Sequence, residues 1–429
     1  MKRLGYASRL GGQLDLEDEL SKKTKPFEVP KSLVWEAWRR VKANKGAEGI
    51  DDQTIEDFES ELSKQLYRIW NRISSGSYFP PAVKAVPILK KSGGVRLLGI
   101  PTVADRVAQT VVTLVLEPNL ESVFDKDSYG YRPGKSALDA IEVTRQRCWK
   151  YDWVLEYDIK GLFDNIDHAL LLKALRHHCK ERWVLLLIER WLTTPMQDRD
   201  GEQHERSVGT PQGGPLSPVL ANLFLHYALD HWLRRTHPMV EFCRYADDGI
   251  LHCTSEAEAK QMRKHLQSRL AECGLEMHPE KTRIVYCRDA NRRGKSKEIQ
   301  FDFLGYTFRP RTVKNRNGEL FTGFTPAMSR SAAKSIRQKI RRWRLQGKSM
   351  HSLEELARFC EPSVRGWMGY FCRFHRSAFE AIAYHLDSAL IRWAMRKFKR
   401  LRGRKKRAHE WLAKQKRIRP KLFAHWCLT

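Results

Sequence analysis

Three aspartates have the residue type and spacing for phosphoryl-transfer chemistry. Asp158 ends the β-rich run Val-Leu-Glu-Tyr-Asp, and Asp247 and Asp248 lie between apolar runs in Arg-Tyr-Ala-Asp-Asp-Gly-Ile-Leu. The apolar flanks predict two strands joined by a tight turn. Adjacent carboxylates repel each other unless water or a cation lies between them, and Mg²⁺ takes oxygen ligands. We therefore expect a carboxylate clamp for two metal ions. The alternative is a solvated hairpin tip, because Asp-Asp-Gly is also a common turn sequence.

A loop rich in glycine and proline lies between the two acidic segments. Its sequence over residues 209–218 is Gly-Thr-Pro-Gln-Gly-Gly-Pro-Leu-Ser-Pro, and an apolar helical segment follows it. Glycines let a backbone approach a flat ligand closely, and the amide of Gln212 can donate to a sugar or a phosphate. The alternative is a plain strand-to-helix connection.

The composition indicates a folded protein with a polyanionic partner. The 429 residues include 78 Lys and Arg against 50 Asp and Glu, which gives a formal charge of +28, yet 41% of the residues are hydrophobic. Nucleic acid is the predicted partner, because Lys and Arg release counterions when they neutralise phosphates; an anionic membrane is the alternative. No apolar run approaches the roughly 18 residues of a membrane-spanning helix. Nine cysteines without a C-x-x-C pair count against a disulfide framework.

The positive charge is concentrated near the C-terminus. Residues 391–429 contain 15 Lys and Arg and one acid, and residues 326–350 contain eight basic residues and no acid. Residues 331–345 place Ile336, Ile340 and Trp343 on one helical stripe and basic residues on a second, which predicts a helix with one buried and one basic face. The basic stripe consists of Lys334, Arg337, Arg341 and Arg344.

Short β-rich runs alternate with amphipathic segments from about residue 49 to residue 308, which is typical of an α/β or α+β domain. A further helix is predicted from Ser32 to the turn-rich segment that begins at Asn44. The predicted strands are Val83–Pro87, Val95–Leu98, Trp153–Ile159, Phe242–Tyr245, Ile250–Cys253 and Arg283–Cys287, and the predicted helices are Val103–Glu117, Leu216–Arg234 and Ser255–Cys273.

The order of these motifs resembles the palm of a reverse transcriptase, and most of all the group II intron-encoded reverse transcriptase/maturase family in its endonuclease-lacking form. The core of the resemblance is Asp158, then Gln212-Gly213, then Tyr245-Ala246-Asp247-Asp248, then Lys281. Further motifs extend it over nearly the whole chain. They are Asn44–Asp51, with Glu48 and then Asp52 where the family has Pro and Gly, Ile88–Gln109 (fingers), Ser128–Gly134, Phe303–Tyr306 (primer grip) and Gly366–Phe371 (thumb).

The resemblance implies an α+β fold, in which a right-hand polymerase with fingers and palm precedes an α-helical thumb or maturase domain and a basic C-terminal segment. The implied divisions are an N-terminal lead-in at 1–30, fingers with the N-terminal loop motif at 31–150, a palm at 151–310, a thumb at 311–390 and a DNA- and RNA-binding segment at 391–429.

The resemblance also implies roles for single residues. Asp158, Asp247 and Asp248 would be catalytic and would bind two Mg²⁺ ions, for which Mn²⁺ is a substitute, with the Ile159 carbonyl as a further ligand. Phe163 would exclude a 2′-hydroxyl, as an alternative to packing in the core. Lys90 and Arg96 would contact the triphosphate, with an exposed hairpin as the alternative. Gln212 would contact the sugar, and Lys281 would donate a proton to pyrophosphate, with a solvated lysine as the alternative. Implied nucleic-acid contacts are Lys334, Arg337, Arg341, Arg344, Arg404, Lys405, Lys406 and Arg407.

The function implied is an RNA-directed DNA polymerase of the cytoplasm that also binds its intron RNA as a splicing maturase. Its partners would be intron RNA, an RNA template with a DNA or RNA primer, target DNA and dNTPs, with no membrane partner. The alternatives are a non-polymerising RNA-binding maturase and a domesticated or defence-associated reverse transcriptase. Because no His/Cys-rich cluster follows the basic tract before Thr429, we expect that the chain does not cut the second DNA strand. The sequence leaves the oligomeric state open.

Overall fold

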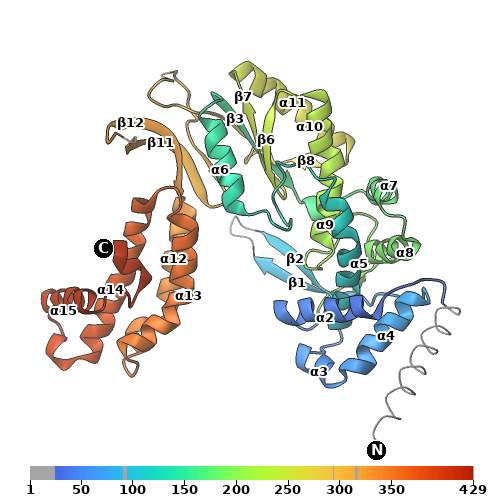
Figure 1. Cartoon of the computed structure of the whole chain (residues 1–429), viewed down its shortest axis with the longest axis horizontal. Coiled ribbons are helices and arrows are strands. Elements are labelled where there is room, and N and C mark those ends of the chain that lie inside the picture. Colours follow the sequence, from blue (N-terminus) through green and yellow to red (C-terminus); the bar gives the residue numbers. More distant parts are fainter. Residues whose placement is uncertain (1–24, 90–93, 293, 315–316, 429) are drawn as a thin grey trace, which may run out of the picture.

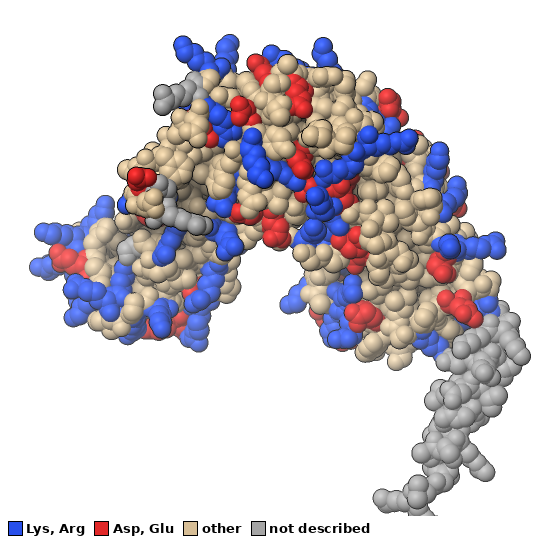
Figure 2. Space-filling model, turned by 45° about the horizontal axis from the view of Figure 1, so that its top comes forward, with Lys and Arg blue, Asp and Glu red and all other residues tan. Residues whose placement is uncertain are grey.

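The computed structural model describes residues 25–89, 94–292, 294–314 and 317–428. Most of the predicted lead-in at 1–30 and the predicted nucleotide contact Lys90 lie outside these residues. Figure 1 shows two lobes: the strands and helices of the first three quarters of the chain form one, and the C-terminal helices form the other. A β-ribbon joins them, and the surface is hollowed between the two lobes (Figure 2).

The N-terminal helices pack against the long helix α5. The predicted helix from Ser32 is confirmed, because α2 buries Val34, Trp38 and Val41 on one stripe and ends at Asn44. A four-stranded sheet in the order β2-β1-β4-β5 lies beside these helices. The elements are α2 (Lys31–Asn44), α3 (Ile55–Ser60), α4 (Leu62–Ser74), β1 (Val83–Leu89), β2 (Val95–Ile100), α5 (Val103–Glu121), β4 (Met196–Gln197) and β5 (Gln203–His204).

Helix α5 continues four residues beyond its predicted end at Glu117, although Pro118 lies inside it. Proline removes one backbone donor and ordinarily breaks a helix interior. Pro118 is on the exposed side of α5, whereas Leu116 and Leu120 are buried. Burial of these leucines therefore holds the last turn of α5 in place.

The central sheet holds the predicted acidic segments. Strand β3 is antiparallel to β7 and β9, and β6 pairs with β7 at the edge of the sheet. The predicted strands of this sheet are confirmed, although β7 begins at Asp248 rather than at Ile250. The elements are α6 (Ala137–Cys148), β3 (Trp153–Lys160), α7 (His168–His178), α8 (Arg182–Thr193), β6 (Glu241–Tyr245), β7 (Asp248–Cys253), α11 (Glu256–Glu272), β8 (Glu276–Met277) and β9 (Arg283–Tyr286).

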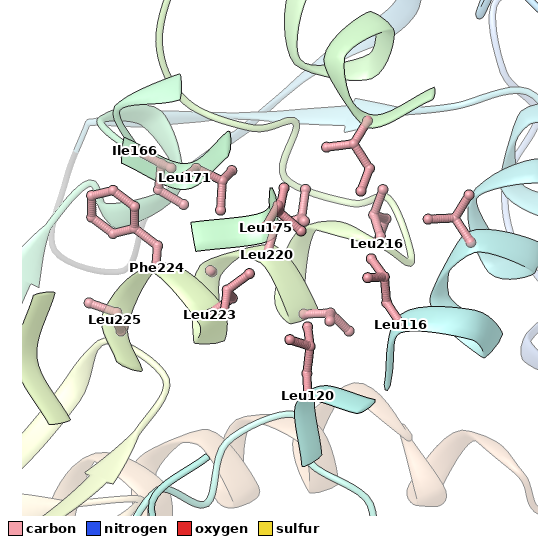
Figure 3. Close-up of a cluster of buried hydrophobic side chains, with 14 of the residues drawn as sticks. Leu116, Leu120, Ile166, Leu171, Leu175, Leu216, Leu220, Leu223, Phe224 and Leu225 are labelled. Atoms are coloured by element: carbon pink, nitrogen blue, oxygen red, sulfur yellow. The ribbon is translucent and has the colours of Figure 1, made fainter. Parts of the chain in front are cut away.

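The apolar segment after the Gly/Pro loop is a helix in three parts, where the sequence predicts one continuous helix over Leu216–Arg234. An α-helix, α9 (Ser217–Leu225), is followed by a π-helical segment at His226–Asp230 and by α10 (His231–Thr236). Helix α9 is the centre of a leucine-rich core between α5 and α7 (Figure 3). Its labelled members are Leu116, Leu120, Ile166, Leu171, Leu175, Leu216, Leu220, Leu223, Phe224 and Leu225.

The C-terminal lobe is a helical module whose core continues into α6 and the central sheet of the first lobe. Helix α12 buries Ile336 and Ile340 as predicted, but it ends at Arg342, and Arg344 lies beyond it in a left-handed conformation with φ 46°. The module and its ribbon consist of β10 (Phe301–Phe303), β11 (Tyr306–Lys314), β12 (Leu320–Met328), α12 (Arg330–Arg342), α13 (Leu353–Phe371), α14 (Glu380–Lys397) and α15 (Lys405–Ile418).

The implied divisions at 310/311 and 390/391 fall inside β11 and α14 respectively. Trp393, Phe423 and Trp426 are buried in the same core as α12 and α13. In the described part of the chain, the basic C-terminal segment is therefore built into the helical module. None of the described helices is both long and apolar enough to cross a membrane.

Candidate functional site

The three predicted carboxylates meet at one end of the central sheet. Asp158 on β3 lies directly opposite Asp248 on β7 in the antiparallel ladder, and Asp247 occupies the turn between β6 and β7. The predicted tight turn is thus confirmed. Its first residue, Ala246, has a left-handed φ of 56°, which is uncommon for a residue with a Cβ atom.

The site concentrates negative charge that lacks full compensation from cations. Burial and the neighbouring charges of Asp247 and Asp158 raise the pKa of Asp248 to about 7. Burial also raises the pKa of Asp247, while Lys281 and Arg96 oppose that shift. Because ionised carboxylates on paired and adjacent residues destabilise one another, a bound cation or a proton is needed to keep them together at neutral pH.

Lys281 supplies part of the positive charge. Its Nζ donates to Asp158 Oδ2 at 2.7 Å, and its side chain is 52% exposed. Burial opposes the charged form of Lys281, but the hydrogen bond to Asp158 and the nearby carboxylates raise its pKa. The backbone also fixes this region, since the amide of His278 donates to the Asp158 carbonyl at 2.8 Å.

A fourth carboxylate, Glu156, was not predicted. It lies two residues before Asp158 and so shares its face of β3. Burial raises the pKa of Glu156 to about 7, although Arg283 donates to it at 3.1 Å. A cavity of about 390 Å³ is lined by Glu156, Asp158, Asp248, Lys281 and Arg283, among others.

The donor set fits hard divalent cations. The carboxylates offer only oxygen, and Ile159, whose carbonyl is a predicted ligand, is 1% exposed and held in register with Met277 of β8. A different group, Asp198, Glu202 and His204, has ligand atoms within 4.8 Å of one another on the β4–β5 hairpin. Asp198 there already accepts hydrogen bonds from two backbone amides of the turn, so local structure accounts for that group.

The Gly/Pro loop packs against the turn that carries Phe163. Thr210 N donates to the Phe163 carbonyl at 2.7 Å. A Cβ atom on Gly209, whose φ is 79°, would lie 2.7 Å from the carbonyl oxygens of Phe163 and Asp164, so this close approach requires glycine. Phe163 itself is half-buried and packs against the main core, which leaves both its predicted gating role and its packing role open.

Gln212 is held in place between two elements. Its Nε2 donates to Asp164 Oδ1 at 2.9 Å, and its carbonyl accepts from Gly99 N of β2 at 2.7 Å. The next residue, Gly213, has a φ of 133°, and a Cβ atom there would lie 2.5 Å from the Gly99 carbonyl. The loop thereby connects β2, which carries the exposed Arg96, to the turn after Asp158.

Sequence reasoning missed residues that surround the Ala246–Asp247 turn. Tyr131 has a left-handed φ of 57° and is 54% exposed; burial of its hydroxyl and the Asp247 charge raise its pKa. Arg244 is fully buried and contacts Asp230, which lies on the π-helical segment. The motif Ser-Tyr-Gly-Tyr-Arg at 128–132 pointed to this region, but nothing in the sequence indicated a buried arginine.

The predicted nucleic-acid contacts lie on the helical module, where Lys and Arg cover much of the visible surface (Figure 2). Of those on or near α12, Arg337 is partly buried and the others are exposed. The four consecutive residues at the start of α15 are all exposed, and their roles stay predictions. These two groups are Lys334, Arg337, Arg341 and Arg344, and Arg404, Lys405, Lys406 and Arg407.

Comparison with known protein families gives two matches. Residues 88–308, more than half of the chain, match the family model for reverse transcriptase (RNA-dependent DNA polymerase). Residues 333–411 match the group II intron, maturase-specific domain. The first match contains the carboxylates and the Gly/Pro loop, and the second covers most of the helical module.

Curated relatives agree with these matches. The group II intron-encoded protein LtrA of Lactococcus lactis is 35% identical over 212 residues, which cover 49% of this chain and 35% of LtrA. Protein YkfC of Escherichia coli is 29% identical over 326 residues, covering 66% of this chain and 82% of YkfC. The chain thus spans about a third of the length of LtrA. A solved telomerase from Candida albicans shares 14% identity with a TM-score of 0.46, covering 79% of this chain and 62% of that one.

Proposed function

We propose that the chain is an RNA-directed DNA polymerase that also acts as a splicing maturase. The chain belongs to the reverse transcriptase (RNA-dependent DNA polymerase) family and carries a group II intron maturase-specific domain. The observation that carries the polymerase proposal is the placement of Asp158 opposite Asp248, with Asp247 in the adjoining turn. The family uses divalent metal ions, and Mg²⁺ is the ion that we propose here.

Asp158, Asp247, Asp248 and the Ile159 carbonyl would hold two Mg²⁺ ions. Bound there, these ions would activate the primer 3′-hydroxyl and neutralise charge on the departing pyrophosphate. Arg96 would bind phosphate oxygens of the incoming dNTP as a charged donor, and Lys281 would turn from Asp158 to the same phosphates. Phe163 would close the space that a ribose 2′-hydroxyl requires.

Primer extension tests the polymerase proposal. Purified chain is given an RNA template with an annealed DNA primer, dNTPs and Mg²⁺, and we expect extension that Asp247→Asn abolishes while RNA affinity stays within about twofold. Glu276→Gln is the matched control, since Glu276 pairs with Lys160 one residue beyond Ile159 in an exposed ion pair at 2.9 Å. Exposed pairs of this kind contribute about 0–1 kcal/mol, so this variant should extend the primer normally.

The maturase domain supports intron RNA as the second partner. Phosphate contacts make affinity fall with salt, with a logarithmic slope of roughly 0.7–0.9 per contact. Replacing the four exposed residues 404–407 by Gln should lower that slope by up to about three and weaken binding to intron RNA. If wild-type chain binds this RNA and promotes its splicing but extends no primer, the non-polymerising maturase is the correct function.

A further inference from the structure

A buried ion pair connects the Ala246–Asp247 turn, called the catalytic turn below, to the π-helical segment at His226–Asp230. Arg244 lies three residues before Asp247, and the side chains of Arg244 and Asp230 are both 0% exposed. Arg244 Nε donates to Asp230 Oδ1 at 2.7 Å, and Nη2 donates to Asp230 Oδ2 at 2.5 Å. Two parallel hydrogen bonds fix the plane of the guanidinium as well as its position.

The remaining donors of Arg244 reach three other elements. Nη1 donates to Asn222 Oδ1 on α9 and to the Ala246 carbonyl, each at 3.1 Å. Nη2 also donates to Ser128 Oγ at 2.8 Å. A guanidinium has five N–H groups, and each one of Arg244 has a partner here. A lysine has three donors on one atom and could not make the same set of bonds.

The catalytic turn is held from two sides. On one side, Arg244 binds the carbonyl of Ala246, whose left-handed backbone is unfavourable for a residue with a Cβ atom. On the other side, Gly130 packs so closely that a Cβ atom on it would lie 2.4 Å from Ala246 N. Asn222 Nδ2 donates to the Gly130 carbonyl at 2.7 Å, so the same network fixes both sides of the turn.

The π-helical segment explains how Asn222 and Asp230 reach one guanidinium. The two residues are eight positions apart, and in a regular α-helix such residues are offset by about 80° around the axis. The wider i→i+5 turn at His226–Asp230 reduces that offset. π-Helical segments inside α-helices are frequent at functional sites, where the wider turn changes the direction of a side chain.

We propose that Arg244, together with Asp230 and Asn222, is a positioning group that holds the Ala246–Asp247 turn in its metal-binding geometry; this inference rests on the proposed polymerase function. Their side chains bind one another, Ser128 and the carbonyls of Gly130 and Ala246, so we expect them to act through the turn. Their removal should act as loss of outer-shell partners does at metal sites, where affinity or activity falls roughly 10–100-fold.

The double variant Arg244→Met with Asp230→Leu tests the proposal, because apolar residues of similar size replace a buried ion pair without leaving a charge unpaired. Asn222→Ala removes the link to Gly130 and keeps the ion pair. Leu266→Ala is the control, since Leu266 is fully buried on α11 and its truncation lowers stability but removes none of the hydrogen bonds of Arg244. Binding of Mn²⁺ to each full-length chain is measured by electron paramagnetic resonance, and amide hydrogen exchange is measured over residues 244–249.

We expect the double variant and Asn222→Ala to bind Mn²⁺ roughly 10–100-fold more weakly, with faster exchange at the turn and a lower kcat at unchanged KM for template and primer. Leu266→Ala should change none of these. Wild-type Mn²⁺ affinity in the folded double variant would overturn the proposal. If the wild-type chain itself neither binds Mn²⁺ nor extends a primer, the proposed polymerase function fails. In that case, amide exchange at the turn that is unchanged in the double variant refutes the positioning role independently.

Discussion

Asp387 lies at the centre of a buried network that holds the basic C-terminal segment in the helical module. It is 6% exposed on α14. Its Oδ2 accepts from Lys416 Nζ of α15 at 2.6 Å, and its Oδ1 accepts from His425 Nε2 at 3.0 Å and Trp426 Nε1 at 3.1 Å. One carboxylate therefore joins α14, α15 and the last turn of the described chain.

Asp387→Ala leaves the donors of His425 and Trp426 buried without the Asp387 acceptor and removes one partner of Lys416. Breaking a buried charged pair in this way costs about 3–5 kcal/mol. Since about 1.4 kcal/mol is a factor of ten, amides of α14 and α15 that exchange through opening of the module should exchange roughly 150- to 4,000-fold faster. Mn²⁺ binding at the distant carboxylates should not change.

Hydrogen exchange followed by mass spectrometry measures this effect peptide by peptide. Glu354→Gln is the matched control, because the Glu354–Arg419 ion pair also joins two parts of the module but both of its side chains are 46% exposed. Exposed pairs contribute about 0–1 kcal/mol, so exchange in the control should rise less than about fivefold. Equal exchange in Asp387→Ala and Glu354→Gln would refute the reasoning.

The same carboxylate makes a pH prediction with a definite sign. Burial alone would raise the pKa of Asp387, but the hydrogen bond from His425 and the charges of His425 and Lys416 outweigh it and lower the pKa. A carboxylate with a lowered pKa stabilises the fold above its unfolded value of about 3.9. The part of the protection of α15 that the Asp387 carboxylate supplies should therefore be present above about pH 4 and be lost as the pH falls below that value.

Three further predictions concern the proposed catalytic site. Because the pKa of Asp248 is about 7, a metal ion must displace a proton at lower pH, and Mn²⁺ affinity should fall roughly tenfold from pH 8 to pH 6; a pH-independent affinity by electron paramagnetic resonance contradicts this. Lys281→Ala removes the cation beside Asp158 and should leave Mn²⁺ affinity equal or higher while raising KM for dNTPs roughly 10–100-fold in steady-state extension; an unchanged KM shows that Lys281 only balances charge. Phe163→Ala should raise ribonucleotide incorporation relative to deoxynucleotide incorporation by roughly 10–200-fold in single-nucleotide assays, and an unchanged ratio in a folded variant assigns Phe163 to core packing.

The local sequence predicts the acidic site well because strand alternation and turn chemistry are short-range. The apolar runs around Asp247 and Asp248 predicted the β6–β7 hairpin, and the same pattern predicted β3. The start of β7 at Asp248 was missed because Asp248 and Gly249 have low β-propensity. Their pairing with β3 outweighs that propensity.

Features that depend on distant partners could not be predicted. An arginine is ordinarily exposed, and the side chains that bind Arg244 lie 14, 22 and 116 residues away along the chain, so no local pattern marks it as buried. The division at 390/391 followed the charge run, and it falls inside α14. Trp393, Phe423 and Trp426, which are interleaved with that charge, bury their side chains in the module.

Metal binding, protonation and nucleotide binding should be linked through one pair of side chains. Without a metal ion, the ammonium group of Lys281 neutralises Asp158, with 2.7 Å between Lys281 Nζ and Asp158 Oδ2. The raised pKa of Asp248 allows a proton to neutralise part of the remaining negative charge. At the proposed site, two divalent ions would bind at full strength only if that proton left and Lys281 turned away. A dNTP triphosphate offers Lys281 a new anionic partner, so nucleotide and metal should each bind more tightly in the presence of the other, by the same factor. Lys281→Ala should reduce this mutual effect, because the metal ions displace the ammonium group of Lys281 from Asp158 and the dNTP triphosphate binds it.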